Sequence, residues 1–205
     1  NIWAPAFDKD YSDLASFKCD FIYWINTELL SSSVNKIYKR GLITELYPEN
    51  MSFGEDLVFV LNYLKHCNRI SFTQEPLYQH EVYNSVSLTH SFSPARFSNL
   101  EDIQKAILDF ADDKNKINPR IYDKYVKDAL HLTRMWYKNK NVPYIRKKEI
   151  IGEWLKQSYI RKLKISDYQL HWKDRMLLHC LHMSCFIGIN LIVNGKEYIN
   201  SLSKE

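Results

Sequence analysis

The sequence predicts an α+β fold that is mostly helical, with a first region of residues 1–93 and an all-helical second region of residues 94–205. Hydrophobic residues make up 45% and aromatic residues 14% of the 205 positions, which suffices for a buried core and excludes a disordered chain. Strand-like alternation occurs at residues 69–73 and 77–83, whereas helical periodicity dominates after Pro94.

The charge distribution supports the same division. Residues 1–94 contain seven Lys and Arg against eleven Asp and Glu, a net charge of −4, whereas residues 95–205 contain 21 against 13, a net charge of +8. Such a shift favours two regions with different partners, although an ordinary solvated helical surface also explains the basic half. The chain begins with Asn1 and shows no signal-peptide pattern, so we expect a piece of a longer protein. Its four scattered cysteines are predicted to be reduced and mostly buried: Cys19, Cys67, Cys180 and Cys185.

The elements of the first region follow from local patterns. Apolar positions at helical spacing predict a mostly helical segment over residues 9–30, and residues 34–43 are typical of a short strand that passes into a helical turn. Residues 47–50 contain Pro and Asn and are predicted to form a loop. Gly54 is acceptable at a helix start, and the apolar run behind it predicts a helix central to the core.

The second region is predicted to consist of helices. Asn118-Pro119 and Val142-Pro143 are typical helix starts. The expected helices cover residues 95–113, 119–139, 143–157 and 170–193. The most apolar stretch, residues 177–193, is too short and too interrupted by His to predict a membrane span, and a buried helix is the simpler interpretation.

Two adjacent carboxylates, Glu55 and Asp56, stand behind Gly54 at the start of the predicted core helix. Carboxylates in a first turn interact favourably with the positive end of the helix dipole, so helix capping explains the pair. Alternatively, one of them takes a proton from a substrate, and repulsion between neighbours would raise the proton affinity of one.

The motifs around this pair have a characteristic order. The segment Asn35-Lys36-Ile37-Tyr38-Lys39-Arg40 comes first, Glu55-Asp56 follows, then a strand at residues 69–73, then Leu77-Tyr78 and Ser85-Val86-Ser87. This ordered set, over residues 31–90, resembles the second half of the catalytic domain of glycosyltransferase family 2. The resemblance implies that residues 1–93 are the acceptor-side half of a GT-A domain, a Rossmann-like α/β fold, followed by a helical extension.

The resemblance also implies a reaction. Enzymes of this family transfer a sugar, with inversion, from a nucleotide diphosphate sugar to a saccharide or lipid-linked acceptor. The resemblance suggests a hexosyltransferase of bacterial surface-polysaccharide or capsule synthesis. By matching position, Asp56 would be the general base that deprotonates the acceptor hydroxyl, with Glu55 orienting the loop or touching the acceptor. The chain lacks the Gln-x-x-Arg-Trp motif of processive members, which favours addition of a single sugar.

A divalent metal, Mg²⁺ or Mn²⁺, is expected in the intact enzyme, held by an Asp-x-Asp motif at the end of a strand. Asp8-Lys9-Asp10 has this spacing, but the preceding residues do not resemble a buried strand, and the motif stands too close to Asn35. We therefore expect the metal ligands and the nucleotide-binding half to precede Asn1, and these 205 residues alone to be inactive.

Four further residues are candidate contacts. Lys36, Arg40 and Tyr78 are candidates for binding the acceptor or a phosphate, although a solvated face or a structural role also explains each of them. His80 falls where some GT-A enzymes have a metal-facing side chain, but a histidine in a strand is more often structural.

Residues 134–175 combine 12 Lys and Arg against four Asp and Glu with interspersed aromatic residues. Such a surface fits an anionic membrane, and plain packing explains it equally well. Nucleic acid is disfavoured as a partner because no recognised nucleic-acid-binding module is present. The expected location is the cytoplasm, with peripheral attachment to the inner face of the plasma membrane. The alternative function is a non-catalytic helical domain that docks on a membrane or a partner.

Overall fold

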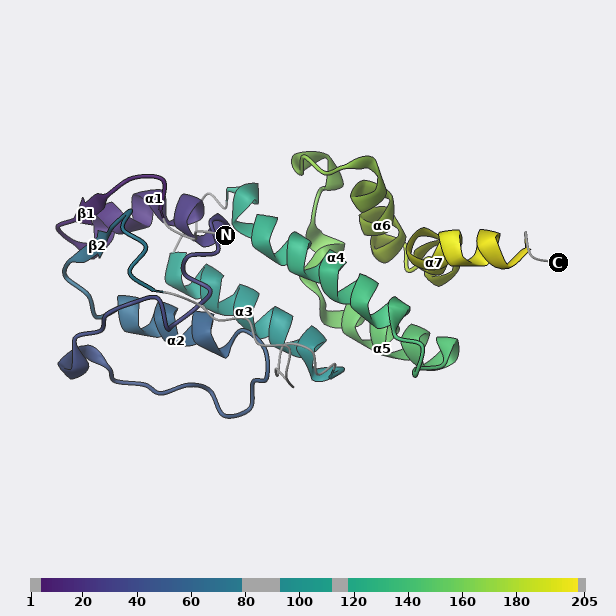
Figure 1. The fold of residues 1–205 in the computed structure, drawn as a ribbon, viewed down its shortest axis with the longest axis horizontal. Coiled ribbons are helices and arrows are strands. Elements are labelled where there is room, and N and C mark those ends of the chain that lie inside the picture. The colour runs from purple at the N-terminus through teal and green to yellow at the C-terminus, as the bar shows by residue number, and fades with distance from the viewer. Residues whose placement is uncertain (1–4, 79–92, 112–117, 203–205) are drawn as a thin grey trace. The chain divides into compact units, whose positions relative to one another are not determined.

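The computed structural model describes residues 5–78, 93–111 and 118–202, with side chains described up to residue 195 (Figure 1). Helices dominate this part of the chain, and its sheet has two short strands, so the mostly helical α+β class is confirmed. The elements, with η for 3-10 turns, are β1 (Lys9–Tyr11), α1 (Leu14–Asn26), η1 (Arg40–Leu42), α2 (Glu55–Leu64), β2 (Ile70–Phe72), α3 (Ala95–Ala111), η3 (Pro119–Tyr122), α4 (Asp123–Lys138), α5 (Tyr144–Gln157), η4 (Tyr159–Lys162), η5 (Ile165–Asp167), α6 (Trp172–His182) and α7 (Phe186–Leu202).

The chain forms two compact units, Asn1–Lys124 and Tyr125–Glu205. The division falls later than residue 93 because α3 packs on α2 and buries Ile103 and Phe110 in the core of the first unit. The predicted boundary at residues 93–94 rests on where strand signals end in the sequence, whereas the boundary after Lys124 reflects contacts between helices.

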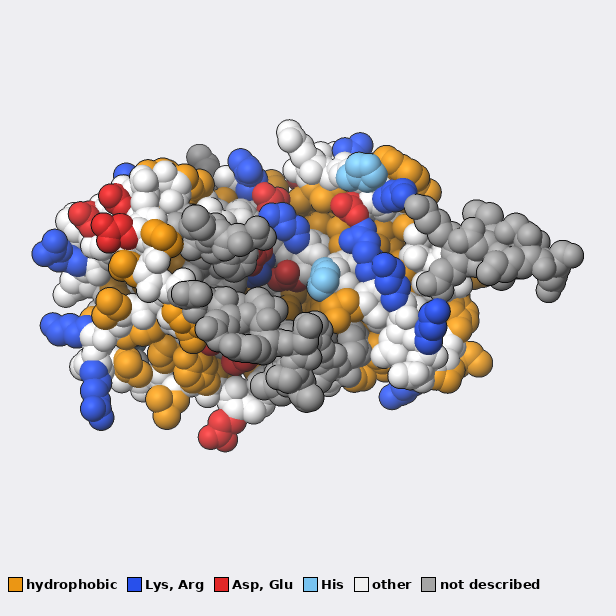
Figure 2. Space-filling view, viewed as in Figure 1, with side chains coloured by type: hydrophobic (Ala, Val, Ile, Leu, Met, Phe, Trp, Pro, Cys, Tyr) orange, Lys and Arg blue, Asp and Glu red, His pale blue; other side chains and the backbone are white. Residues whose placement is uncertain are grey.

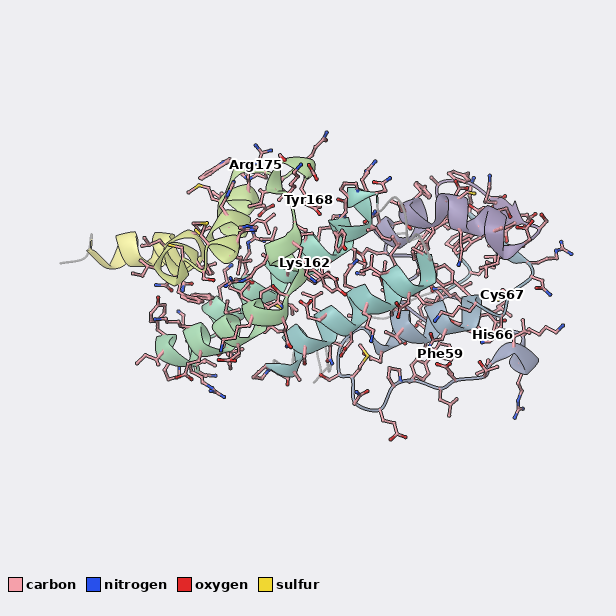
Figure 3. The ribbon with its side chains drawn as sticks, turned by 180° about the vertical axis from the view of Figure 1, so that it is seen from behind. Phe59, His66, Cys67, Lys162, Tyr168 and Arg175 are labelled. Carbon is pink, nitrogen blue, oxygen red and sulfur yellow. The ribbon has the colours of Figure 1, made fainter. Side chains whose placement is uncertain are left out.

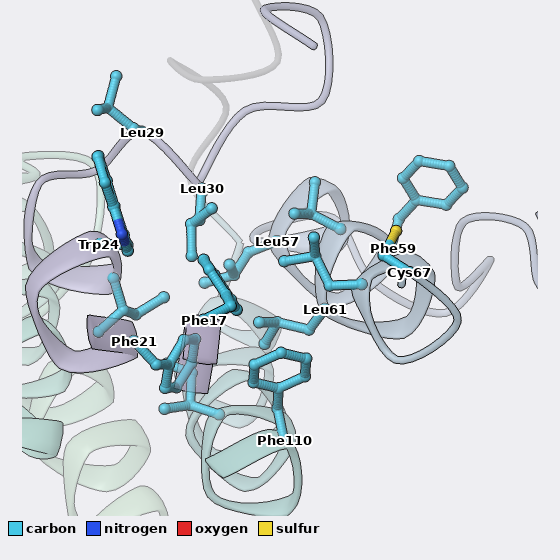
Figure 4. Close-up of a cluster of buried hydrophobic side chains, with 14 of the residues drawn as sticks. Phe17, Phe21, Trp24, Leu29, Leu30, Leu57, Phe59, Leu61, Cys67 and Phe110 are labelled. Atoms are coloured by element: carbon cyan, nitrogen blue, oxygen red, sulfur yellow. The ribbon is translucent and has the colours of Figure 1, made fainter. Parts of the chain in front are cut away.

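The core of the first unit is built by α1, α2 and α3 around large aromatic side chains (Figure 4). The antiparallel strands β1 and β2 pair Lys9 with Phe72 and Tyr11 with Ile70. The ring of Trp24 stacks on that of Phe72 at 3.7 Å, and its Nε1 donates a hydrogen bond of 2.6 Å to the hydroxyl of Tyr11. These contacts attach the small sheet to α1, and each buried aromatic ring removes a large apolar area from water.

The second unit is a set of helices whose interior contains several large aromatic residues. Figure 3 shows Tyr168 and Lys162 in the connection between α5 and α6, and Arg175 on α6. Of the aromatic residues in the basic segment 134–175, Trp136, Tyr137, Trp154 and Tyr168 are buried, whereas Trp172 is exposed. For these four rings the structure favours packing, one of the two interpretations that the sequence left open, because they are buried in the core.

Most predicted helices are confirmed, with two exceptions. The segment predicted to be mostly helical over residues 9–30 begins with β1, and α1 covers only Leu14–Asn26 within it. The expected single helix over residues 170–193 is wrong, since the chain forms α6 and α7 with a break at residues 183–185. Ser184 takes the left-handed conformation, with φ 52°, and its N–H bonds Leu181 O, while the N–H of Cys185 bonds Cys180 O at 2.7 Å. This pattern is the Schellman motif that ends many helices, usually with glycine in place of Ser184, so the sequence carried no stop signal.

Other local predictions had mixed outcomes. Residues 34–39 have irregular structure instead of the expected strand, and the helical turn after them is present as η1. The strand at residues 69–73 is confirmed as β2, while the strand predicted at residues 77–83 falls mostly outside the described residues. All four cysteines are unpaired thiols, but Cys19 and Cys185 are exposed, so the prediction of mostly buried thiols is wrong for these two.

Candidate functional site

The predicted catalytic carboxylates lie in the first turn of α2, as the sequence indicated. Gly54 precedes them with φ 78°, a left-handed conformation that side chains other than that of glycine rarely allow. A Cβ atom at this position would stand 2.1 Å from Cδ1 of Ile103, so there is also no room for a side chain here. Glycine thus sets both the angle at which the chain enters α2 and the close approach of α3.

Asp56 is held by a hydrogen bond from a distant part of the chain. The hydroxyl of Ser33, a buried residue, donates to Oδ1 of Asp56 at 2.6 Å across 23 positions of sequence. Glu55, in the same turn, is partly exposed. Because hydrogen bonds to a carboxylate are stronger than those between neutral groups, Ser33 fixes the orientation of Asp56 at the start of the helix.

Lys36 is bonded to oxygen atoms of the loop around Ser33. Its ammonium group donates to Leu29 O at 2.6 Å, to Asn35 Oδ1 at 2.6 Å and to Ser32 O. Burial lowers the pKa of Lys36 to about 8, and the negative charge of Asp56 opposes this shift. An ammonium group has three hydrogens, and all three are directed at this loop, so the geometry favours a structural role over contact with a phosphate.

Tyrosine contacts hold the rest of the segment along α2. The hydroxyl of Tyr38 donates to Ser33 O at 3.0 Å, and the N–H of Lys39 donates to the hydroxyl of Tyr63 on α2 at 2.7 Å. The rings of Tyr38 and Tyr63 meet edge to face at 4.8 Å, and burial raises the pKa of Tyr38. Phe59, which Figure 3 labels on α2, stacks on Tyr47. The segment from Ser33 to Lys39 therefore lies along α2, with Ser33 bonded to Asp56 in the first turn and Lys39 bonded to Tyr63 near the end of the helix.

The remaining predicted residues have less definite places. Arg40 is exposed in η1, and no hydrogen bond or ion pair joins it to Asp56 in the described part of the chain. Tyr78 is exposed at the end of a described segment. His80 and Ser85-Val86-Ser87 lie outside the described residues. Sequence reasoning missed Ser33, because a serine in a run of three serines carries no signal of its own; its position two residues before Asn35-Lys36 is the only hint.

No metal site can be assembled from the described residues. Over residues 5–78, 93–111 and 118–202, no group of three or more His, Cys, Asp or Glu side chains could hold an ion. Asp8 has another role, since its Oδ1 accepts a hydrogen bond of 2.6 Å from the N–H of Gln74 just beyond β2. The described residues therefore do not fit the Mg²⁺ or Mn²⁺ that the resemblance implies.

A separate cavity of about 310 Å³ lies in the second unit, between α5 and α7. Its lining contains none of the predicted site residues and no charged side chain: Tyr144, Ile187, Asn190, Leu191, Asn194 and Gly195. Its lining contains no carboxylate, imidazole or amine, so Asp56 and its surroundings remain the candidate site.

Comparison with known proteins adds no assignment. No family model, curated protein or solved structure matches the chain. In the described part of the chain, no helix has both the length and the apolar character that crossing a bilayer requires.

Proposed function

We propose that this chain is part of a nucleotide-sugar-dependent transferase. More particularly, we propose the acceptor-side half of an inverting GT-A glycosyltransferase like those of family 2, acting on a saccharide or lipid-linked acceptor in surface-polysaccharide synthesis. The observation that carries the proposal is the hydrogen bond from Ser33 to Asp56, because it joins the segment before Asn35-Lys36 to the Glu55-Asp56 pair. Ser33 stands two residues before the Asn35–Arg40 motif, so this bond brings the start of that segment to the carboxylate pair.

In this proposal, Asp56 takes the proton of the acceptor hydroxyl while its oxygen attacks the anomeric carbon. A hydroxyl is a weak nucleophile at neutral pH, so a positioned carboxylate that accepts its proton contributes about 10²–10⁴-fold to the rate. Ser33 holds Oδ1 of Asp56, and Oδ2 is the oxygen that takes the proton. Lys36 keeps the loop around Ser33 in place through its bonds to Leu29 O and Ser32 O.

The nucleotide-binding half and the metal ligands belong, in this proposal, to a segment before residue 1. The intact enzyme would work in the cytoplasm, at the inner face of the plasma membrane where lipid-linked acceptors are found. The 205-residue chain by itself is expected to release no nucleotide from a nucleotide diphosphate sugar. Measurable turnover by this chain would refute the proposal that the nucleotide and metal sites lie outside these 205 residues.

Asp56→Asn in the longer protein tests the catalytic role. We expect sugar transfer to fall by at least about a hundredfold, with the circular dichroism spectrum unchanged, because an amide cannot act as the base. Asp109→Asn, an exposed carboxylate on α3 of the same unit, is the matched control and should leave transfer unchanged. An Asp56→Asn enzyme that transfers at the wild-type rate would exclude Asp56 as the base.

The second candidate function is a non-catalytic helical domain that docks on a membrane or a partner, and the exposed ring of Trp172 on α6 favours it. Asp56 would then serve only to stabilise the start of α2. Its replacement by Asn would cost about 1–2 kcal/mol of unfolding free energy through the weakened bond from Ser33. No activity would be affected, so the same variant separates the two functions.

A further inference from the structure

One face of α6 exposes large apolar side chains in a row. Trp172 and Met176 on the helix and Met183 at its C-cap are exposed to 59%, 48% and 75%, and they follow one another at spacings of four and seven residues. Side chains at these spacings lie on the same side of a helix. We call these three residues the α6 face, and Figure 2 shows hydrophobic, basic and histidine side chains together over this helix.

The α6 face is exposed because the opposite side of the helix packs in the core. Leu177, Leu178 and Leu181 are fully buried. The helix also packs closely on α7, where a Cβ atom at Gly188 would stand 2.7 Å from Sγ of Cys180. The helix cannot turn its exposed face inward without losing these contacts, so the face is a stable surface feature.

Cations surround the α6 face. The ammonium group of Lys173 lies 5.3 Å from the ring centroid of Trp172, and Arg175 is exposed one turn along the same side. At the other end, Arg161 donates a hydrogen bond of 2.8 Å to Ser184, next to Met183.

Acidic groups do not balance these cations. Asp174, the acidic residue of α6, forms an ion pair with Arg134 on α4. The second unit contains 15 Lys and Arg against seven Asp and Glu, a net charge of +8. The neighbourhood of the α6 face therefore attracts anions.

We propose that the α6 face binds the surface of an anionic lipid bilayer, with Trp172 and the two methionines in the headgroup region and the cations against lipid phosphates. Tryptophan is typical of this depth, because its ring is apolar and its N–H remains hydrated. Each Lys or Arg near an anionic leaflet adds to the affinity. A protein partner fits less well, since a standard interface buries about 800 Å² on each side, more than three side chains on one helix supply.

Flotation of the purified 205-residue chain with vesicles tests the proposal. The vesicles are made of phosphatidylcholine, with or without one third of phosphatidylglycerol. We expect binding only to the anionic vesicles, and a loss of at least about tenfold in partitioning for Trp172→Ser/Met183→Ser. Ile37→Ser, which removes a 96% exposed apolar side chain from the first unit, is the matched control and should bind as the wild type does.

Charge is tested with a second pair of variants that change the net charge equally. Lys173→Glu/Arg175→Glu should lower partitioning by at least about tenfold, since both cations border the α6 face. Lys127→Glu/Lys138→Glu, at exposed positions of α4, should lower it much less. All the side chains replaced in these variants are exposed, and thermal unfolding will verify that each variant folds.

Three results would overturn the proposal. The first is a wild-type chain that does not float with anionic vesicles. The second is equal loss in the two charge variants, which would mean attraction by net charge without a defined face. The third is a concentration-dependent dimer, seen by light scattering, that Trp172→Ser/Met183→Ser abolishes, because the α6 face would then be covered by a second copy of the chain.

Discussion

Gly54→Ala is predicted to destabilise the first unit strongly. Two costs add at this position. Holding a residue other than glycine at φ 78° costs about 1–2 kcal/mol. The new Cβ would stand 2.1 Å from Cδ1 and 2.6 Å from Cγ1 of Ile103, a buried side chain on α3, and displacing it within a packed core costs about 1–2 kcal/mol more. The free energy of unfolding should therefore fall by about 2–4 kcal/mol.

Gly41→Ala is the matched control for this experiment. A Cβ atom at Gly41 meets nothing within 4 Å, and the residue is exposed at η1 without a left-handed φ. Its replacement should change the unfolding free energy by less than about 0.5 kcal/mol. Both variants are compared with the wild type by urea unfolding of the 205-residue chain, followed by far-UV circular dichroism and by tryptophan fluorescence.

A third variant separates the two costs. Ile103→Val in the Gly54→Ala background removes Cδ1, the atom nearest to the new Cβ, and should recover about 0.5–1 kcal/mol relative to the sum of the single changes. If Gly54→Ala proves as stable as Gly41→Ala, the argument that Gly54 sets the start of α2 is refuted. If the cost appears without any coupling to Ile103, the backbone conformation alone is responsible.

Two further predictions concern buried charges. The pKa of Lys36 is about 8 in the folded chain and 10.5 in the unfolded chain, so the unfolded state binds more protons between these values, and stability should increase as the pH rises from about 8. Lys36→Met should lose this contribution, which is at most about 1 kcal/mol per pH unit. Urea unfolding of both proteins from about pH 7.5 to 9.5 measures it as the difference between their slopes, because the free thiols and tyrosines also begin to titrate in this range but do so in both proteins. Equal slopes in the two proteins would contradict the prediction. Glu28 pairs at 2.6 Å with the buried Lys124 and takes a left-handed φ of 63°. Glu28→Ala should lower the free energy of unfolding by about 3 kcal/mol, because it removes the charge opposite Lys124. Glu28→Gly should lower it by about 1 kcal/mol less, because glycine adopts this φ without strain. A glycine variant less stable than the alanine variant would refute the idea that the backbone at Glu28 is strained.

Local patterns predicted much of this fold. The apolar run behind Gly54 predicted α2 and its central place in the core, and both are confirmed. Proline placed the start of η3 at Pro119 and of α5 just after Pro143. These predictions succeeded because capping residues, proline and amphipathic spacing act over a few neighbouring residues. The end of α6 was missed for the converse reason, since Ser184 adopts a conformation that its residue type does not indicate.

The candidate site shows the limit of such reasoning. The sequence by itself determined that Glu55 and Asp56 stand in the first turn of a core helix, because a glycine, two acids and an apolar run specify this locally. Only the tertiary structure decided that Ser33 holds Asp56, that Lys36 is buried among the oxygen atoms of its own loop, and that Trp172 is exposed whereas Trp136 and Trp154 are buried. These facts depend on how segments distant in the chain pack together, and packing free energy is a property of the assembled core that no local pattern contains.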